Sequence, residues 1–246
     1  VETLMGITEM GRYTVSARGI KIAAAMSVLD YQPKNMPLAI LQPGKDGGCS
    51  YCAACDSRSC PVGAKASVFT RTVLDDNSLK GSITLLYGCV VKKIALDKQG
   101  HAGSVECYIP FSSQHLSVPV ENVICCGNAI QSSALLMRSK SHYAPQGIGN
   151  DYDLVGRGLS FKISGYSIGS NPLWLQQADL GAPHQGAPAT VYTDAFYQAP
   201  DVPTGLGGLI YEAASPFPEQ NIGHLRIHYL AGAEAWSHNR ISLDDE

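Results

Sequence analysis

Four cysteines stand close together in the segment Cys49-Ser-Tyr-Cys52-Ala-Ala-Cys55-Asp-Ser-Arg-Ser-Cys60-Pro61. Three thiolates separated by two-residue gaps can converge on one inorganic cluster, and the proline after the last cysteine turns the chain away. The spacing, C-x2-C-x2-C-x4-C-P, is one residue longer than a run that holds [4Fe–4S] or [3Fe–4S] centres. Cys49, Cys52, Cys55 and Cys60 are therefore candidate metal ligands, and a cluster on them would indicate electron transfer.

Three alternatives stay open for these thiols. Structural zinc also uses four cysteines, but usually as two C-x2-C pairs separated by a longer loop. Disulfides can form between the pairs, although short loops strain their geometry. The thiols can also simply be buried in a tight turn. The remaining cysteines lie in apolar, strand-like runs and are expected in the core; they are Cys89, Cys107, Cys125 and Cys126.

The segments on either side of the cysteines must position them. Small and apolar residues recur at helical spacing over residues 12–30, which predicts a helix that Pro33 and Pro37 end. After the cysteines, Pro61 suits a helix start, and the chain from Ala64 onward is expected to continue as a short helix.

The middle of the chain predicts a hairpin, then a strand and a helix. Residues 82–96 and 103–109 alternate or run apolar around a turn at 97–100. Residues 118–126 are predicted to form a further strand, whose apolar end is expected to be buried on both faces. Gly127 leads into a helix over residues 129–138. The N-terminus of that helix could face a phosphate, although an ordinary packing glycine explains the pattern at least as well.

From about residue 151 the chain changes character. Proline, glycine and aromatic residues become frequent and helical periodicity is lost, so an antiparallel sheet is expected. Its strands are predicted at 159–168, 189–197, 206–213, 223–231 and 239–243. The fold class predicted is α/β plus an antiparallel-sheet domain (α+β), with one domain over residues 1–150 and a second over 151–246.

Composition limits the remaining functional classes. The chain has 246 residues, 45% hydrophobic and 16% charged, which is ample for a core. Its net charge is −3 without a basic block, which argues against a nucleic-acid partner. No apolar run is long enough to cross a bilayer, and no signal peptide is visible, so we expect a soluble cytoplasmic or periplasmic protein.

Several motifs are missing or weak. The chain lacks a dinucleotide glycine fingerprint, a P-loop and a G-x-S-x-G nucleophile elbow. His224 and His228 share one face of a predicted strand. A metal pair there is one reading, and exposed strand histidines are the more common explanation.

With these residues in view, the chain resembles the glucose–methanol–choline (GMC) family of flavin oxidoreductases, in the branch of sugar and long-chain alcohol dehydrogenases and oxidases. The resemblance covers residues about 40–243 in the family's order. It rests on Cys60-Pro-Val-Gly-Ala-Lys-Ala-Ser67, on Val91-Lys-Lys-Ile94, on 123–139 with Gly147-Ile-Gly-Asn150 and Val155-Gly-Arg-Gly-Leu159, and on Asn239-Arg-Ile-Ser-Leu243.

The resemblance implies oxidation of an alcohol, usually on a sugar or another polyol, with FAD as cofactor. By the same resemblance, Val91 and the run Gly127, Asn128 and Ala129 would bind FAD. Family members with cysteines in this loop look like enzymes that pass electrons to a [3Fe–4S] centre and on to a haem- or quinone-linked partner.

The chain also departs from the family pattern. The N-terminal G-x-G-x-x-G and the C-terminal His–Asn or His–His pair are absent, so the chain is expected to be the central portion of such an enzyme. Where many members have L-x-x-H, this chain has Leu159-Ser-Phe-Lys162. No catalytic base is therefore assigned. The rival hypotheses are a non-catalytic iron–sulfur subunit, a flavin oxidase with structural cysteines, and a binding module without a redox role.

Overall fold

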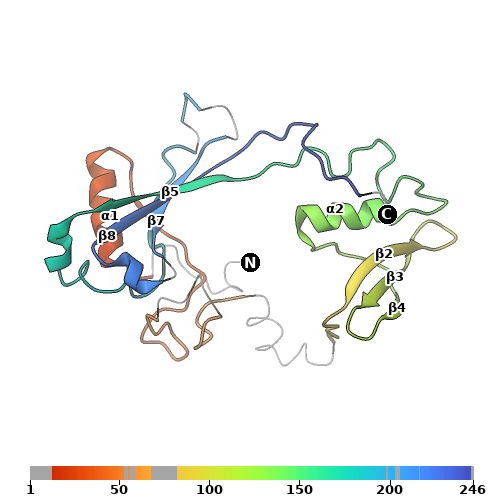
Figure 1. Ribbon diagram of the computed structural model, residues 1–246, viewed down its shortest axis with the longest axis horizontal. Helices are drawn as coiled ribbons and strands as arrows, with labels where there is room; N and C mark the ends of the chain where they lie inside the picture. The colour runs from red at the N-terminus through yellow and green to blue at the C-terminus, as the bar shows by residue number, and fades with distance from the viewer. Residues whose placement is uncertain are drawn as a thin grey trace. The chain divides into compact units, whose positions relative to one another are not determined.

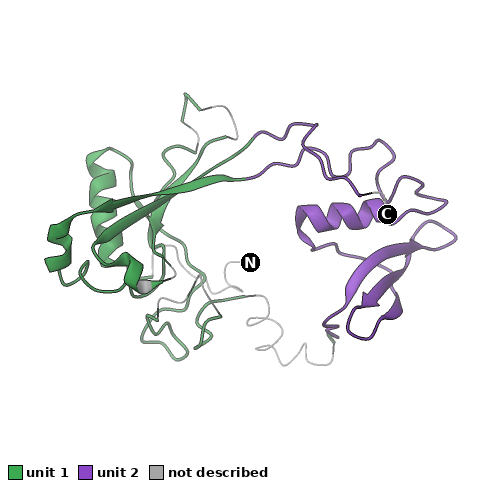
Figure 2. Cartoon of the chain, viewed as in Figure 1, with its two compact units in different colours: residues 1–83, 162–233 green, residues 84–161, 234–246 purple. Residues whose placement is uncertain are grey.

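The computed structural model describes residues 13–52, 55, 59–67, 82–197, 199–202, 206–215 and 217–244. The chain forms two compact units, each made from two separate segments (Figure 2). Residues 1–83 and 162–233 form the first, called here the sheet unit. Residues 84–161 and 234–246 form the second, called here the meander unit.

The sheet unit is built on one antiparallel sheet of five strands in the order β1-β6-β7-β8-β5 (Figure 1). The strands are β1 (Lys34–Asn35), β6 (Val191–Thr193), β7 (Gly208–Ala213), β8 (His224–Ala231) and β5 (Ile163–Ser170). Two short 3-10 helices, η2 (Pro172–Gln176) and η3 (Pro218–Asn221), connect them. The sheet confirms the prediction for the second half of the chain, and β1 adds an edge strand from the first half.

Helix α1 (Ala17–Val28) covers one face of this sheet. It begins at Ser16, whose side-chain oxygen accepts a hydrogen bond from Gly19 N at 2.8 Å, as expected of an N-cap serine. Ile22 and Met26, one turn apart, are each 5% exposed and pack with Val191 of β6. The helix predicted over residues 12–30 is therefore confirmed for 17–28, while residue 12 lies outside the described residues.

The meander unit holds three antiparallel strands and one helix. The strands β2 (Val90–Leu96), β3 (Ala102–Ile109) and β4 (Gln114–Pro119) follow one another in order, and α2 (Asn128–Arg138) packs on β2. Ser139, fully buried, joins the two elements: its hydroxyl accepts from Ile94 N at 2.9 Å and donates to Leu135 O at 2.7 Å. The predicted helix is confirmed, and the hairpin is confirmed over 90–96 and 102–109, whereas residues 82–89, which were expected in its first strand, belong to no strand.

Several other predicted elements are wrong or shorter than expected, among them the strand predicted at 189–197, which is reduced to 191–193. Residues 123–126 belong to no strand, because no described strand lies beside them to pair with their backbone. Ile124 among them is 87% exposed. Cys125 and Cys126 are exposed rather than in the core, whereas Cys107 is buried. The strand predicted at 239–243 is reduced to a single bridge between Arg157 and Arg240. Residues 61–67 form turns instead of a helix, and residues 68–81 lie outside the described residues.

The two compact units do not follow a single cut near residue 150. Because Ile22 and Met26 of α1 pack on the sheet, the first part of the chain joins residues 162–233 instead of 84–161. Residues 234–246 likewise return to the unit of α2. None of the helices that the structure describes is long and apolar enough to cross a membrane.

Candidate functional site

The cysteine loop, residues 49–60, lies between two segments of the sheet unit that pair with each other. Ile40 forms a bridge with Lys65, and Cys49 N donates to Leu41 O at 3.1 Å, so both ends of the loop are held together. The Lys65 ammonium reaches across the loop and donates to the carbonyl oxygen of Cys55. The loop is therefore closed at its base, which brings the four cysteines into one region.

Each thiol, however, has a different environment. Cys49 shares a hydrogen bond with the Tyr13 hydroxyl at 3.2 Å. Burial raises the pKa of Cys55, and the nearby Cys49 raises it further. For Cys60, burial also raises the pKa, but hydrogen bonds from the backbone amides of residues 62–65 outweigh it and leave the pKa lowered. Cys60 is thus more readily ionised than Cys55.

The structure shows Cys49, Cys52, Cys55 and Cys60 as free thiols. Over the described ranges, which include all four, no group of three or more cysteine, histidine or carboxylate side chains is arranged to hold a metal ion. The iron–sulfur assignment therefore has no support from this geometry.

The residues expected to bind FAD lie in the meander unit. Val91 is on β2 and 38% exposed. Gly127, Asn128 and Ala129 form the start of α2, and all three are exposed. Asn128 adopts a left-handed φ of 59°, and its side-chain oxygen accepts from Ile130 N at 2.9 Å and Gln131 N at 3.1 Å. The helix start is therefore accessible, but its own asparagine already caps part of it.

These residues fit a flat, partly anionic group. Val91 and Ile130, 44% exposed, offer uncovered apolar surface, and the accessible N-terminal end of α2 favours negative charge. A side chain at Gly127 would meet Gln131 Cβ at 3.3 Å, so the glycine is also needed for local packing. The assignment of the four residues to FAD stays a prediction.

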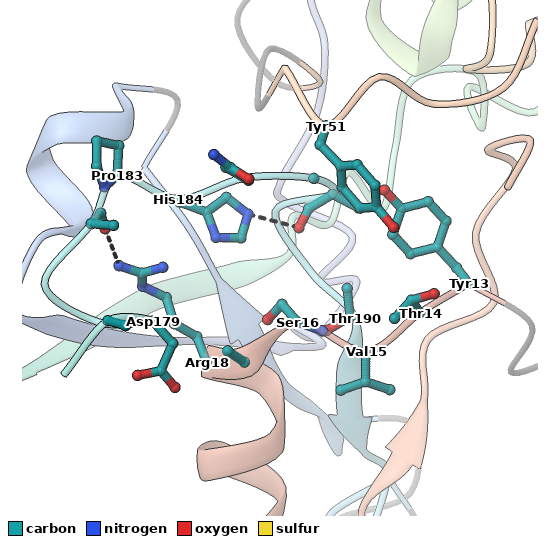
Figure 3. A pocket seen from close by; sticks show the side chains of 16 residues that line it. Tyr13, Thr14, Val15, Ser16, Arg18, Tyr51, Asp179, Pro183, His184 and Thr190 are labelled. Atoms are coloured by element: carbon teal, nitrogen blue, oxygen red, sulfur yellow. Dashed lines mark hydrogen bonds between the residues drawn. The ribbon is translucent and has the colours of Figure 1, made fainter. Parts of the chain in front are cut away.

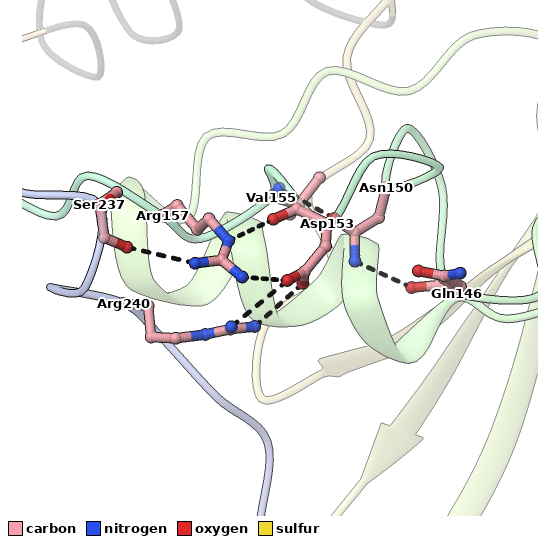
Figure 4. A network of polar contacts seen from close by, with 7 residues as sticks. All are labelled: Gln146, Asn150, Asp153, Val155, Arg157, Ser237 and Arg240. Atoms are coloured by element: carbon pink, nitrogen blue, oxygen red, sulfur yellow. Dashed lines mark hydrogen bonds and ion pairs between the residues drawn. The ribbon is translucent and has the colours of Figure 1, made fainter.

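A polar network fixes the segment that follows α2 (Figure 4). Arg240 binds Asp153 through both terminal nitrogens, at 3.0 and 3.4 Å, and Arg157 pairs with the same carboxylate. Asn150 accepts from Val155 N at 2.9 Å. The guanidinium groups of Arg157 and Arg240 both lower the pKa of Asp153, and Arg157 has the larger effect. Every partner in this network is internal, so its role is to position the chain.

A cluster of aromatic and basic side chains lies on the sheet face opposite α1. Ile210 and Ile227 pack toward α1, so their neighbours Tyr211 and His228 project from the other face. His228 stands opposite both Tyr211 and Tyr166 in the strand register. The Tyr211 hydroxyl and His228 Nδ1 are 2.5 Å apart. The sheet-face cluster thus spans three adjacent strands.

Arg226 completes the sheet-face cluster. Its guanidinium lies 5.4 Å from the centre of the Tyr166 ring, a cation–π distance, and its Nε is buried with no hydrogen bond inside the described part of the chain. Arg226, His228 and the two tyrosines line a cavity of about 280 Å³. Among the residues that the structure describes, no three or more histidine, cysteine or carboxylate side chains are grouped to hold a metal ion. His224, two residues before Arg226, is therefore not part of such a group. In the sequence, the sign of this cluster is the alternation of side chains along the predicted strands 206–213 and 223–231. That alternation was not used to place Tyr211, Arg226 and His228 on one face.

Comparison with known proteins gives one family and two relatives. The profile of the family described as GMC oxidoreductase matches residues 1–163. The chain is 33% identical to paromamine 6'-oxidase of Streptomyces fradiae over 226 residues, which cover 89% of this chain and 41% of that protein. It is 36% identical to 6'''-hydroxyparomomycin C oxidase of Streptomyces lividus over 196 residues, covering 78% and 35%. The chain thus spans less than half the length of either relative.

Proposed function

This chain belongs to the GMC oxidoreductase family, and we propose that the enzyme of which it forms part oxidises a hydroxyl group of a sugar-like alcohol with FAD as cofactor. The observation that carries the proposal is the sheet-face cluster. Tyrosine rings can stack on the C–H face of a sugar, while the guanidinium and imidazole nitrogens bind its hydroxyls. A cavity of about 280 Å³ is of the size of one hexose ring.

The two relatives support the substrate class. One is named as an oxidase of paromamine and the other as an oxidase of 6'''-hydroxyparomomycin C, and each aligns with most of this chain. Substrate preference among sugars can vary within one scaffold, so the proposal for this chain is limited to a sugar-like alcohol.

Bound FAD would supply the acceptor for the hydride lost from the alcohol carbon. In this chain, Val91, Gly127, Asn128 and Ala129 would hold the cofactor. The sheet-face cluster would bind and orient the sugar. The base that removes the hydroxyl proton is assigned to no residue of this chain.

The test uses the flavin-loaded full-length enzyme and a panel of alcohols. We expect oxidation of sugars with KM values well below those for simple alcohols such as ethanol. Tyr166→Ala should raise KM for the sugar about tenfold, because stacking on an aromatic face is lost. Tyr152→Ala is the matched control, since Tyr152 is 86% exposed in the meander unit. Equal KM values for sugars and ethanol, or an unchanged KM in Tyr166→Ala, would contradict the proposal.

A second candidate concerns the fate of the electrons. The spacing of Cys49, Cys52, Cys55 and Cys60 favours an iron–sulfur relay, with a haem- or quinone-linked acceptor; both relatives are instead named oxidases. Anaerobically purified protein with about three or four irons per chain, acid-labile sulfide and absorption near roughly 400 nm would support the relay. Iron-free protein that consumes oxygen during turnover would support a flavin oxidase with structural cysteines.

A further inference from the structure

The cavity at the sheet-face cluster contains a positive charge without a negative one. Among the described residues that line it, Arg226 is the one with a permanent charge, and none is a carboxylate. Tyr166, Tyr211 and His228 supply the other polar groups, and the remaining lining residues are one proline and three alanines. The cavity therefore offers a cation to any molecule that enters it.

The protein does not neutralise Arg226 from outside the cavity either. In the strand register it stands opposite Ala213 of β7 and Ile168 of β5, which carry no charge. Glu212, the neighbour of Ala213, projects toward α1 instead and contacts the start of that helix. None of the ion pairs between described residues includes Arg226. Its cation–π contact with Tyr166 supplies no hydrogen-bond acceptor.

Arg18, at another cavity of the same unit, shows the contrast. That cavity, of about 400 Å³, lies at the N-terminal end of α1 (Figure 3). Arg18 Nη2 donates to three backbone carbonyl oxygens at 2.8–3.3 Å, among them that of Ala182, and Asp179 lines the same cavity. Arg18 thus has acceptors and a nearby negative charge within the protein. Arg226 has neither, so we expect a bound molecule to supply both.

The side chains beside Arg226 add hydrogen-bond donors. The Tyr211 hydroxyl and His228 Nδ1 are 2.5 Å apart. Because a phenol is a stronger donor than a neutral imidazole, the hydroxyl donates to Nδ1 and the imidazole proton stays on Nε2, which is then a donor as well. A carboxylate only accepts hydrogen bonds, so it suits this group of donors. An ammonium group only donates and carries the same charge as Arg226, so it does not.

We propose that the sugar-like substrate carries a carboxylate, as a uronic acid does, and that Arg226 binds this carboxylate in the sheet-face cavity. This inference rests on the proposed function and narrows its substrate class. A guanidinium can bind a carboxylate through two parallel N–H···O bonds, which fixes the orientation of the sugar as well as matching its charge. Arg226 then determines specificity: it favours acidic sugars over neutral ones and disfavours amino sugars.

The experiment is calorimetric titration of the flavin-loaded full-length enzyme at neutral pH and low salt. Binding is read instead of turnover, so the result does not depend on which hydroxyl is oxidised. The probes are methyl glucuronide, its uncharged methyl ester, methyl glucopyranoside and the cationic methyl glucosaminide. We expect methyl glucuronide to bind about tenfold or more tightly than the ester and the glucopyranoside, and the glucosaminide to bind most weakly. Added salt should reduce the preference, because it screens charge.

Variants of Arg226 assign the preference to this side chain. Arg226→Gln removes the charge, so the affinity for methyl glucuronide should fall about tenfold or more, to that of the ester, with the affinity for the ester nearly unchanged. Arg226→Lys keeps the charge without the paired N–H groups and should retain part of the preference. Lys34→Gln is the matched control, because it removes the same charge from a side chain that is 46% exposed and does not line the cavity.

The outcomes separate this inference from the proposed function. Equal affinity of the wild-type enzyme for methyl glucuronide and its ester would refute the inference, as would a preference that survives in Arg226→Gln. Tighter binding of methyl glucosaminide would also refute it. Reduction of the bound flavin by sugars tests the proposed function itself. If methyl glucuronide is preferred through Arg226 but no sugar reduces the flavin, the proposed function fails and the role of Arg226 in binding a carboxylate stands.

Discussion

Glu212 of β7 links α1 to the sheet, and its removal gives the sharpest test of how the sheet unit is held together. The residue is fully buried. Its carboxylate accepts from Thr190 N at 2.7 Å, from the Thr190 hydroxyl and from the Ser16 hydroxyl. Ser16 in turn caps α1. Glu212→Ala therefore removes the acceptor on which the start of α1 and the approach to β6 converge.

The size of the effect follows from the groups left behind. Thr190 N loses its acceptor in a buried position, and an unsatisfied buried donor costs about 1–3 kcal/mol. The two hydroxyls can rotate toward other acceptors, so their loss adds less. We expect the free energy of local opening of α1 to fall by about 2–3 kcal/mol, which corresponds to roughly 30- to 150-fold faster amide exchange.

The assay is hydrogen exchange read by mass spectrometry on peptides covering α1, in the full-length protein. Glu219→Ala is the control, because Glu219 is exposed in η3. The acceleration should be confined to α1 and β6. Unchanged exchange of α1 in Glu212→Ala would refute the role given to this carboxylate. Equal acceleration in α2 would show a global loss of stability, and the argument for a local link would fail.

Three further predictions concern the rest of the chain. Ser139→Ala leaves Ile94 N without its acceptor, so exchange of the β2 amides should accelerate in keeping with a loss of about 1–3 kcal/mol. Iodoacetamide at neutral pH should alkylate Cys60 faster than Cys55, because the pKa of Cys60 is lowered and that of Cys55 raised; mass spectrometry of both peptides would expose the reverse order. The pKa of Asp153 is lowered by its arginines, so its stabilisation is lost as pH falls below about 4. Melting temperatures of Asp153→Asn and wild type should converge there, and a constant gap would contradict the pairing.

The sequence predicted those elements whose pattern and neighbours agree. The strands at 206–213 and 223–231 have local turns and alternating side chains, and β7 and β8 form almost where expected. Residues 123–126 have an equally apolar pattern, but a strand also needs a partner, and none of the described strands supplies one. The periodicity of a sequence shows which side chains share one face of a strand, but it does not show which strand lies beside it.

The candidate sites were harder to predict for the same reason. The cysteine spacing suggested one shared centre, whereas the partners of the thiols come from distant segments, such as Tyr13 for Cys49. The sheet-face cluster depends on register: Tyr166, Tyr211 and His228 meet only because three strands align at one position. No local spacing carries that information.

The link between Ser16 and Glu212 also has a consequence for synthesis of the protein. The two residues are 196 positions apart in the chain. At about 5–20 residues per second, a ribosome needs roughly 10–40 s to pass from one to the other. During that interval α1 has neither its carboxylate partner nor the sheet that covers Ile22 and Met26. The nascent helix therefore offers an apolar stripe to chaperones until β7 and β8 have been synthesised.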